Sequence, residues 1–424
     1  MTAKDIGFLG HGGKKIHERI YRGSLKGLDS LTSIDVNSQT ANECLGIGYG
    51  FLSPLEGFMT RNETDSVCSK MSLSDDTLWS IPINLNMAEE EIKTKGVKEG
   101  DDILLTYDKK PLAVLNVEEI FNYNLEDMAR QVYGTTDPKH PGVKRTLSQK
   151  GRFIAGKVEL VQEPVFQPPF DKYWLTPRQH FELYKKRGWK HIVAHQTRNV
   201  PHTGHEWLMK YCWFAANEDL PVDELRTGVL VNAVIGEKRI GDYIDEAIVL
   251  GQAELGNAGY FKQDVFAVSI LLWDMRYAGP KEAIHHAIVR TNIGCTHHMF
   301  GRDHAGVGNF YKPYDAHYLL KQVKDRLRIK PIFMMENYYC TVCGEVTNAA
   351  LDGHEDKSQS FSGTLIRSIL IDGVKPTRGL MRPEVFDKVM EASTKYGSGS
   401  PFVNEEYLKK RGPIFTLSRD FRGE

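Results

Sequence analysis

Residues 191–206 read HIVAHQTRNVPHTGHE, and this stretch decides the fold of the central part of the chain. Its first residues, His191–His195, form an apolar run that is typical of a buried strand. A polar loop follows, and apolar residues at helical spacing predict a helix from about His205 to Asn217. The stretch therefore predicts a strand, a loop and a helix in direct succession.

A second helix is predicted just upstream. Thr176 is a suitable N-cap, Pro177 suits the first helical position, and Gln179 completes a capping box. Gly188 is a plausible end for this helix, because glycine adopts the left-handed conformation that closes many helices.

The alternation of strands and helices continues downstream. Three further apolar runs predict buried strands, and helix-length segments such as Pro280–Thr291 separate them; the runs are Gly228–Ile235, Val265–Trp273 and Cys295–Phe300. Such alternation predicts an α/β fold with a parallel sheet covered by helices on both faces. Ligands of these sheets bind beside the carboxyl ends of the strands.

The flanking segments have a different pattern. Up to about residue 165 short apolar pieces alternate with turns, which predicts a β-rich domain; examples are Trp79–Leu85, Asp102–Tyr107 and Leu112–Val117. The segment Val161–Phe170 holds three prolines, which oppose regular structure and indicate a domain junction. We expect a β-rich domain over residues 1–168, a catalytic domain over 169–330 and a small C-terminal domain over 331–424.

Composition excludes several classes of protein. The chain has 54 Lys and Arg against 55 Asp and Glu, a balance that opposes a general role in binding nucleic acid. The most apolar run, Val265–Trp273, is too short to cross a bilayer, and the N-terminus lacks the pattern of a secretory signal. Six cysteines do not form a disulfide framework in a chain of this length. We expect a cytoplasmic protein without a membrane partner.

The loop after the first central strand has the features of an anion site. His202 and His205 lie three residues apart at a helix entrance, where backbone N–H groups and the helix dipole attract negative charge. Arg198 adds a planar fork suited to phosphate or sulfate oxygens, and Gly204 permits close approach. The alternative is a polar loop whose histidines cap the helix.

Two further segments suit the same chemistry. The segment Gly301–Gly308 combines three glycines with an arginine after a predicted strand, and its alternative interpretation is a flexible turn. Ser362–Arg367 predicts a helix start whose first turn ends in arginine, and its alternative is a simple N-cap. If the sheet is parallel, the loop that carries Arg198 and the segment Gly301–Gly308 form opposite walls of one pocket.

Together these segments resemble the sulfate adenylyltransferase (ATP sulfurylase) family. The family patterns are matched in order over about 315 residues, at Leu52–Met59, Gln196–His205, Met275–Pro280, Gly301–Gly306 and Ser362–Arg367. The resemblance implies a PUA-like N-terminal domain, a Rossmann-like nucleotidyltransferase domain and a small C-terminal α/β domain. It also implies the reversible reaction of MgATP with sulfate to give adenosine 5′-phosphosulfate and pyrophosphate.

The resemblance also assigns roles to residues. Gln196, Arg198 and the backbone of Ala305 would hold sulfate, and the catalytic set would be Thr197, Arg198, Asn199, His202 and His205. The ATP-binding residues would be Gln196, Thr197, Arg198, Asn199, His202, His205, Gly301, Arg302, Asp303, His304 and Met335. Sulfate is already an anion, so the residue types fit a direct in-line attack on the α-phosphate without a general base or a covalent intermediate.

A cysteine pair in the C-terminal part suggests a metal. Cys340, Cys343 and His354 are three potential zinc ligands, and some family members hold a structural zinc here with three cysteines and one histidine. The third cysteine is missing, so an acidic residue would have to replace it: Asp352, Glu355 or Asp356. Two interpretations stay open, a zinc site and a loop with two free thiols.

Other expectations complete this interpretation. We expect Mg²⁺ as the companion of ATP and a homodimer or other homo-oligomer. We also expect a monofunctional enzyme, because about 57 residues after Arg367 leave no room for an appended kinase domain. His285 and His286 are interpreted as ordinary helix residues, and His297 and His298 receive no role.

Two alternatives to this function stay open. One is a nucleotidyltransferase that uses another acceptor, since the His-x-Gly-His pattern at His202–His205 is shared across that superfamily. The other is an RNA-binding module in the N-terminal half, against which the charge balance weighs.

Overall fold

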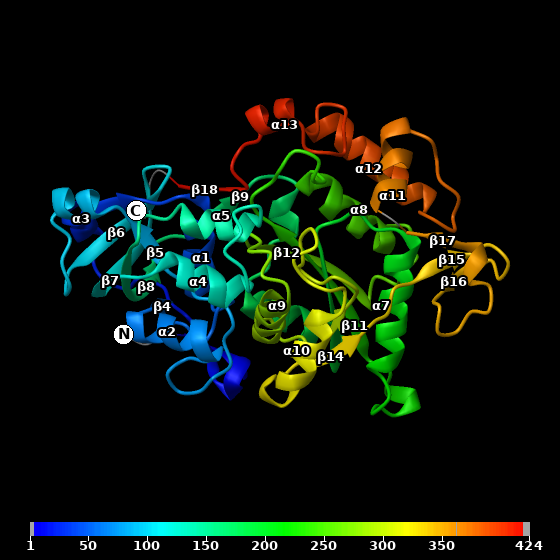
Figure 1. Cartoon of the computed structure of the whole chain (residues 1–424), viewed down its shortest axis with the longest axis horizontal. Coiled ribbons are helices and arrows are strands. Elements are labelled where there is room, and N and C mark those ends of the chain that lie inside the picture. Colours follow the sequence, from blue (N-terminus) through cyan, green and yellow to red (C-terminus); the bar gives the residue numbers. More distant parts are fainter. Residues whose placement is uncertain (1–3, 362, 419–424) are drawn as a thin grey trace.

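A mixed sheet organises the first half of the chain in the computed structural model, which describes residues 4–361 and 363–418 (Figure 1). Its strands run in the order β3 (Thr32–Asp35), β6 (Asp102–Tyr107), β7 (Lys110–Asn122), β8 (Arg152–Leu160) and β4 (Gly57–Phe58), and β5 (Leu85–Met87) also pairs with β8. β3 and β6 are parallel, whereas the other pairs are antiparallel. The helices of this half are α1 (Ser38–Gly48), α2 (Arg61–Lys70), α3 (Glu89–Lys95), α4 (Leu125–Tyr133) and α5 (Pro141–Leu147).

Two of the three strands expected in this half are confirmed. Asp102–Tyr107 is β6, and residues 112–117 lie inside β7. The strand expected over Trp79–Leu85 is wrong, because regular pairing begins only at Leu85. The Trp79 side chain is fully buried and donates its indole N–H to the Ile81 carbonyl at 2.7 Å. Pro82 lacks an N–H for a ladder, so this buried segment is irregular.

The second half contains the predicted parallel sheet. Five strands lie in the order β12 (Phe266–Leu272), β11 (Thr227–Ile235), β10 (His191–Thr197), β13 (His297–Phe300) and β14 (Lys330–Phe333), and all four pairs are parallel. Every residue of β11 is buried, which explains its continuous apolar sequence.

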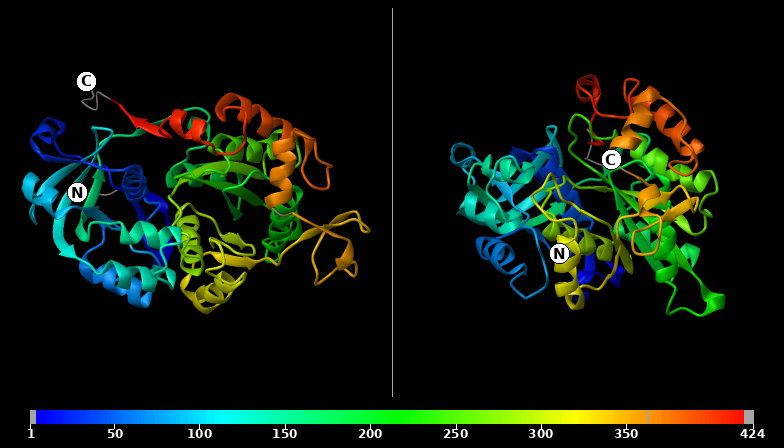
Figure 2. Two further views of the ribbon diagram at one scale, coloured as in Figure 1. Left: turned by 45° about the horizontal axis from the view of Figure 1, so that its top comes forward. Right: turned by 45° about the vertical axis from the view of Figure 1, so that its right-hand side comes forward.

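The order of these strands fixes where loops gather. From β10 the chain moves outward through α7 (Thr203–Ala215) to β11 and through α8 (Asp245–Asn257) to β12. It then crosses back through α9 (Pro280–Asn292) to β13 and through α10 (Asp315–Val323) to β14. Right-handed crossovers therefore place α7 and α8 on one face and α9 and α10 on the other (Figures 1 and 2). The direction reverses between β10 and β13, so a crevice forms at the carboxyl ends of these two strands.

The helix predicted upstream of β10 is confirmed as α6 (Pro177–Arg187). The Thr176 hydroxyl accepts from the Gln179 N–H, and the Gln179 side chain accepts from the Thr176 N–H. Gly188 ends the helix with a φ of 67°. This capping box and its closing glycine fix where the chain turns into β10.

The proline-rich junction is more regular than expected. Pro164–Phe166 forms β9, which pairs antiparallel with β18 (Phe415–Leu417), so the expectation of irregular structure is wrong for these residues. Pro164 is the first residue of the strand, a position where a missing N–H is tolerated. Phe166 stacks on Trp174 with ring centroids 4.6 Å apart.

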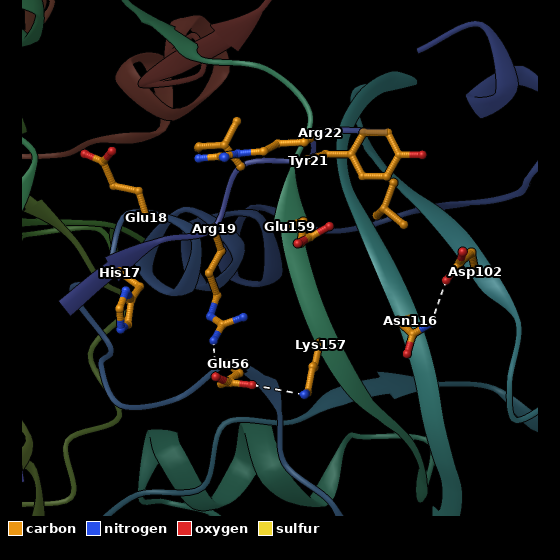
Figure 3. Close-up of a pocket in the computed structure, with 12 residues that line it drawn as sticks. His17, Glu18, Arg19, Tyr21, Arg22, Glu56, Asp102, Asn116, Lys157 and Glu159 are labelled. Carbon is orange, nitrogen blue, oxygen red and sulfur yellow. Dashed lines mark hydrogen bonds and ion pairs between the residues drawn. The ribbon is translucent and has the colours of Figure 1, made fainter. Parts of the chain in front are cut away.

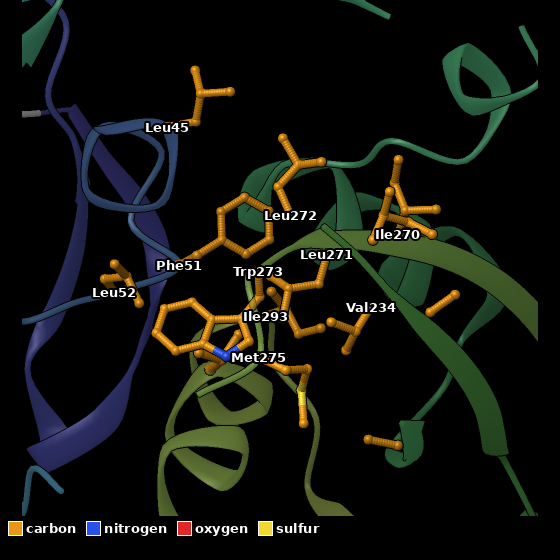
Figure 4. Packing of buried hydrophobic residues seen from close by; sticks show 14 of the residues in the cluster. Leu45, Phe51, Leu52, Val234, Ile270, Leu271, Leu272, Trp273, Met275 and Ile293 are labelled. Atoms are coloured by element: carbon orange, nitrogen blue, oxygen red, sulfur yellow. The ribbon is translucent and has the colours of Figure 1, made fainter. Parts of the chain in front are cut away.

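The two halves share an apolar contact. Phe51 and Leu52 follow α1 in the first half and lie against Leu271, Leu272 and Trp273 at the end of β12 (Figure 4). These side chains are all buried and belong to one continuous hydrophobic cluster that also fills the central sheet. The first half therefore supports the end of β12, the edge strand of the central sheet.

The C-terminal part begins where the sheet ends. β14 reaches Phe333 and belongs to the central sheet, so the sheet extends across the expected boundary at residue 330. A small antiparallel sheet follows, formed by β15 (Tyr338–Cys340), β16 (Glu345–Thr347) and β17 (Ser358–Ser360), and then come α11 (Gly363–Asp372), α12 (Pro383–Tyr396) and α13 (Glu405–Lys410). The division into three domains stays a prediction. Among the described residues, no helix is both long and apolar enough to cross a lipid bilayer.

Candidate active site

A cavity of about 740 Å³ lies at the carboxyl ends of β10 and β13. The loops after these strands form two of its walls, as the parallel sheet predicts. It brings together Gln196, Thr197, Arg198, Asn199, His202, His205, Gly301, Arg302, His304, Ala305 and Met335, which were all predicted from the sequence. Asp303 does not line the cavity; it has a positive φ of 54°, and its backbone N–H donates to the Pro313 carbonyl at 2.7 Å.

The first wall is a fixed turn. The Thr197 hydroxyl donates to the Asn199 carbonyl at 3.2 Å and accepts from the Asn199 N–H at 3.0 Å. Gln252 of α8 donates to the same Asn199 carbonyl at 3.1 Å. The backbone between Thr197 and Asn199 is therefore held before any ligand arrives, so the Arg198 side chain starts from a defined position.

Arg198 is held by two side chains from different loops. Its guanidinium donates to the Tyr277 hydroxyl and lies 3.4 Å from a carboxylate oxygen of Asp242. Tyr277 belongs to the segment between β12 and α9, and its ring lies 5.5 Å from the Arg198 Cζ atom. Although burial opposes the charge, these two neighbours raise the pKa of Arg198, so the guanidinium stays cationic in the cavity.

Three histidines lie beside Arg198 around the start of α7. The rings of His202 and His205 stack with centroids 3.8 Å apart, and His195 lies 5.4 Å from His205. Burial lowers the pKa of His205 to about 4 and the pKa values of His195 and His202 further, so these rings are neutral at pH 7. The Nδ1 atoms of His202 and His205 have no hydrogen-bond partner among the described residues. The helix entrance therefore offers unused polar atoms to a ligand.

Gly204 has a packing role that its sequence pattern does not reveal. A Cβ atom at this position would lie 2.7 Å from the Phe361 ring and 3.0 Å from the His202 ring. Phe361 stacks on His202 with centroids 5.0 Å apart and lines the cavity. The glycine therefore lets the C-terminal part close over the histidine pair.

The second wall is the loop after β13. His317 of α10 hydrogen-bonds the Gly301 carbonyl at 3.0 Å, and the Ala305 carbonyl accepts from the Gly279 N–H at 3.0 Å. Ala305 has a positive φ of 58°, which turns its backbone sharply within the loop. No motif pointed to His317, because its contact with the Gly301 carbonyl depends on how helix α10 packs under the loop.

The outer part of the cavity is more open. Arg302 is half-exposed and lies 3.4 Å from Glu336, while Met335 is also exposed. Asn337 donates its side-chain amide to the Gly204 carbonyl at 3.1 Å. Glu336 and Asn337 were missed by the sequence analysis, although they adjoin Met335, because neither belongs to a motif that the resemblance covers.

His297 and His298, which were left without a role, lie outside the cavity lining. His297 stacks on His191, and its Nδ1 atom lies 2.9 Å from the Thr296 hydroxyl. His298 is fully buried next to Phe300, and neither residue lines the cavity. Neither receives a role in binding.

The third sequence segment contributes support. Ser362 lies outside the described residues. Arg367 donates to the Gly241 carbonyl and lies over the Tyr243 and Phe402 rings, at 5.0 and 4.9 Å from their centroids. It does not line the cavity, so the anion-binding interpretation of this arginine is replaced by one in which it anchors the loop that carries Asp242.

The cysteine pair has a complete set of four donors. Cys340, Cys343, Asp352 and His354 place one ligand atom each within 4.8 Å of one another. The Cys343 sulfur lies 3.5 Å from the His354 Nδ1 atom and 3.6 Å from an Asp352 oxygen. A tetrahedral zinc with bonds of about 2.0–2.3 Å separates its ligand atoms by about 3.5 Å. The second Asp352 oxygen is buried without a hydrogen-bond partner among the described residues. The donor set therefore fits a tetrahedral ion.

A second cavity, of about 710 Å³, lies in the first half of the chain (Figure 3). Its charges compensate one another, since Arg19 and Lys157 both pair with Glu56. Asn116 likewise donates to Asp102 at 2.7 Å. Cations that are already paired with a carboxylate do not favour the binding of a polyanion. The cavity beside β10 and β13 is therefore the better candidate for the active site.

Comparison with known proteins agrees with this choice. The family model described as ATP-sulfurylase matches residues 171–392, and the model described as PUA-like domain matches residues 10–163. The chain belongs to the ATP-sulfurylase family. Three relatives named sulfate adenylyltransferase illustrate the extent of the similarity. The one from Hyperthermus butylicus is 43% identical over 376 residues, covering 88% of this chain and 92% of the relative.

Two other members of the ATP-sulfurylase family are similarly close. The relative from Archaeoglobus fulgidus is 39% identical, covering 87% of this chain and 84% of its own length. The relative from Pyrococcus abyssi is 40% identical, and the match covers 89% of this chain and 96% of the relative. The expected PUA-like and nucleotidyltransferase parts are thereby confirmed.

A solved structure supports the fold. The hexameric APS kinase from Thiobacillus denitrificans superposes with a TM-score of 0.66 at 20% identity, and the match covers 91% of this chain and 69% of that one. At this identity the likeness concerns the fold.

Proposed function

We propose that this chain is a sulfate adenylyltransferase, which joins sulfate to the adenylyl group of MgATP and releases pyrophosphate. The observation that carries the proposal is the cavity beside β10 and β13. It combines a held guanidinium, a helix entrance where two imidazole Nδ1 atoms have no hydrogen-bond partner among the described residues, and a glycine-rich loop. This combination suits two anions that must be brought together.

Sulfate would bind at the inner end of the cavity. Arg198 supplies a cationic fork, and Gln196 has a buried side-chain oxygen without a hydrogen-bond partner among the described residues. Ala305, on the opposite wall, would present its backbone. The contacts of Arg198 with Tyr277 and Asp242 keep the fork in place while the anion arrives.

The triphosphate would lie along the helix entrance. His202 and His205 would stabilise the phosphates in the transition state, with Thr197, Arg198 and Asn199 completing the catalytic set. Gly301, Arg302, His304 and Met335 would line the nucleotide, and Asp303 would act by shaping the loop. Mg²⁺ enters as part of the substrate MgATP, where it neutralises phosphate charge.

The reaction would be a direct transfer. A sulfate oxygen attacks the α-phosphorus, the bond from that phosphorus to the bridging oxygen of pyrophosphate breaks, and the electron pair leaves with pyrophosphate. Sulfate needs no deprotonation, and burial lowers the pKa values of His202 and His205, which makes these rings weak bases that suit hydrogen bonding. Retention of configuration at the α-phosphorus would contradict this mechanism.

The decisive test is sulfate-dependent release of pyrophosphate from MgATP by the purified chain. We expect release with sulfate and none without it. Selenate, molybdate and chlorate should compete, because the cavity would recognise a small oxyanion. Release that depends on another acceptor would favour the alternative nucleotidyltransferase.

We also propose that Cys340, Cys343, Asp352 and His354 hold a structural zinc ion. This aspartate replaces the cysteine that the resemblance leads one to expect. When bound, the ion would join the β15–β16 turn to the loop before β17, close to Phe361. A homodimer or other homo-oligomer and a cytoplasmic site of action complete the proposal, and light scattering of the purified chain tests the assembly.

A further inference from the structure

A buried carboxylate on α9 organises the segment that holds Arg198. Glu282 is fully buried and accepts hydrogen bonds from the Trp273 indole at 2.8 Å and from the Arg276 and Ala278 N–H groups at 2.9 and 3.1 Å. These donors bracket Tyr277, the hydrogen-bond partner of Arg198. One carboxylate thus fixes the turn on the sulfate side of the cavity.

The same carboxylate also points toward the nucleotide side. One turn along α9, the His286 Nε2 atom lies 3.6 Å from a Glu282 oxygen, and the His286 Nδ1 atom lies 3.0 Å from the His304 Nε2 atom. The carboxylate favours a proton on His286 Nε2, which leaves His286 Nδ1 to accept from His304. The remaining nitrogen of His304, Nδ1, is then the atom at which this cavity-lining ring takes up a further proton.

We propose that Glu282 and His286 are positioning residues that act through His304, holding its ring and supporting a proton on it when a polyphosphate anion binds. The inference rests on the proposed function, because it assigns His304 to the pyrophosphate that leaves. His286, which the sequence analysis interpreted as an ordinary helix residue, becomes the link between a buried carboxylate and the cavity.

The charge around Glu282 supports this role. Burial opposes ionisation of its carboxyl group, but His286, Trp273 and the Arg276 backbone outweigh burial and lower the pKa of Glu282 to about 2. The group is therefore a carboxylate at neutral pH. It supplies negative charge within reach of the two histidines, as the aspartate does in a hydrolase triad.

The groups that face His304 come from three elements. Burial lowers the pKa of His304 most. The charges of His286 and Arg290 on α9 and of His317 on α10 lower it further, whereas Glu282 raises it. His298 of β13 also lies near, with ring centroids 5.8 Å apart. Together these groups and burial hold the pKa of His304 well below its usual value, so the ring is neutral at pH 7. A bound polyanion would add the negative charge that tips the ring toward imidazolium.

A titration with inorganic pyrophosphate tests the inference on the unmodified protein. The ¹⁵N chemical shifts of labelled histidines distinguish neutral rings from imidazolium, and the His304→Asn variant identifies the signal. At pH 7 we expect His304 to change from the neutral to the imidazolium signature as pyrophosphate saturates the site. A ring that stays neutral at saturation would overturn the proposal.

A matched pair of variants supplies the second test. Glu282→Gln keeps the shape of the side chain but removes the charge. His285→Gln alters a neighbouring buried ring that stacks on Trp273 and has no hydrogen-bond partner in the described part of the chain. In Glu282→Gln we expect the alkaline fall of kcat to move down by about one pH unit, with KM for sulfate within about twofold. His285→Gln should leave the midpoint of that fall in place.

The outcomes separate the two proposals. An unchanged pH profile in folded Glu282→Gln would mean that the carboxylate is merely structural. If the wild-type chain releases no pyrophosphate with sulfate, the proposed function fails. The pyrophosphate titration would still decide whether the histidine pair behaves as inferred.

Discussion

The Tyr277 hydroxyl accepts a hydrogen bond from Arg198, and the tyrosine ring lies under the same guanidinium, 5.5 Å from its Cζ atom. The two residues come from different loops, so this contact joins the loop after β10 to the loop after β12. It also sets where the cationic fork meets an incoming oxyanion.

Removing the Tyr277 hydroxyl should leave the Arg198 guanidinium less firmly positioned. In Tyr277→Phe we expect KM for sulfate to rise about fivefold with a smaller change in KM for ATP, because one hydrogen bond contributes about 1 kcal/mol. Steady-state kinetics with varied sulfate measures the effect. Tyr311→Phe is the control, since it removes a hydroxyl that donates to the Tyr133 carbonyl outside the cavity lining. Equal effects in both variants would contradict a specific role.

Replacing Arg198 should have a larger effect. Arg198→Leu removes a charge-assisted contact to sulfate, and we expect kcat/KM for sulfate to fall by about 100-fold or more. Arg198→Lys keeps the charge but loses the planar fork, so it should restore little of the activity. Wild-type turnover in Arg198→Leu, measured by pyrophosphate release, would refute the assignment of the site.

The ion pair between Glu206 and Arg382 joins the start of α7 to the C-terminal part. Arg382 donates to both Glu206 oxygens at 2.9–3.1 Å, and the Glu206 side chain is 2% exposed. Arg382→Met would leave a buried carboxylate unpaired, so we expect a loss of about 3–5 kcal/mol in the free energy of unfolding. Urea denaturation measures it. The double variant Glu206→Gln/Arg382→Met should recover part of the loss, and no recovery would contradict the explanation.

Acid should destabilise the fold through buried neutral histidines. Burial lowers the pKa values of His11 and His180 to about 4, although hydrogen bonds to backbone carbonyls oppose the shift. Between pH 6.5 and 4 the unfolded chain binds protons that the folded chain does not, so stability is lost as the pH falls through this window. Each group contributes at most about 3 kcal/mol. Urea midpoints at pH 7.5, 6.5, 5.5 and 4.5 check the slope, and a flat profile would exclude the effect.

The zinc proposal predicts one ion per chain in protein washed with a weak chelator, measured by elemental analysis. Cys343→Ser and Asp352→Ala should each lose the ion and lower the melting temperature, because a closed structural site needs its four ligands. Cys295→Ser is the control, since this cysteine is buried just before β13 and far from the donor set in the sequence. Metal-free wild-type protein of unchanged stability would favour the alternative of two free thiols.

The parts of the fold that the sequence predicted depend on local signals. The capping box at Thr176 and Gln179 fixed the start of α6, and the unbroken apolar run of β11 marked a strand buried on both faces. The site followed from topology, because Gln196 and Gly301 lie far apart in sequence but end adjacent parallel strands. The strand expected at Trp79 failed although apolar residues occupy every second position from Trp79 to Leu85, because Pro82 has no N–H for a ladder and pairing begins only at Leu85.

The missing parts are long-range contacts. The contacts of Tyr277 and Asp242 with Arg198, of Phe361 with His202 and of His304 with His286 depend on how loops meet after the sheet has formed. The periodicity and composition of the sequence do not predict contacts between residues of different loops. The resemblance named Tyr277 as part of a matched segment, but its role emerged only from the position of its hydroxyl.

The pairing of β9 with β18 has a consequence for how the protein is made. About 250 residues separate the two strands in the chain, so at about 5–20 residues per second the ribosome needs about 12–50 s between them. During translation β9 has no partner strand until β18 has been made, so this strand pair at the junction of the two halves forms late. A nascent chain stalled before Phe415 should therefore be more open to protease at residues 161–170 than the finished molecule.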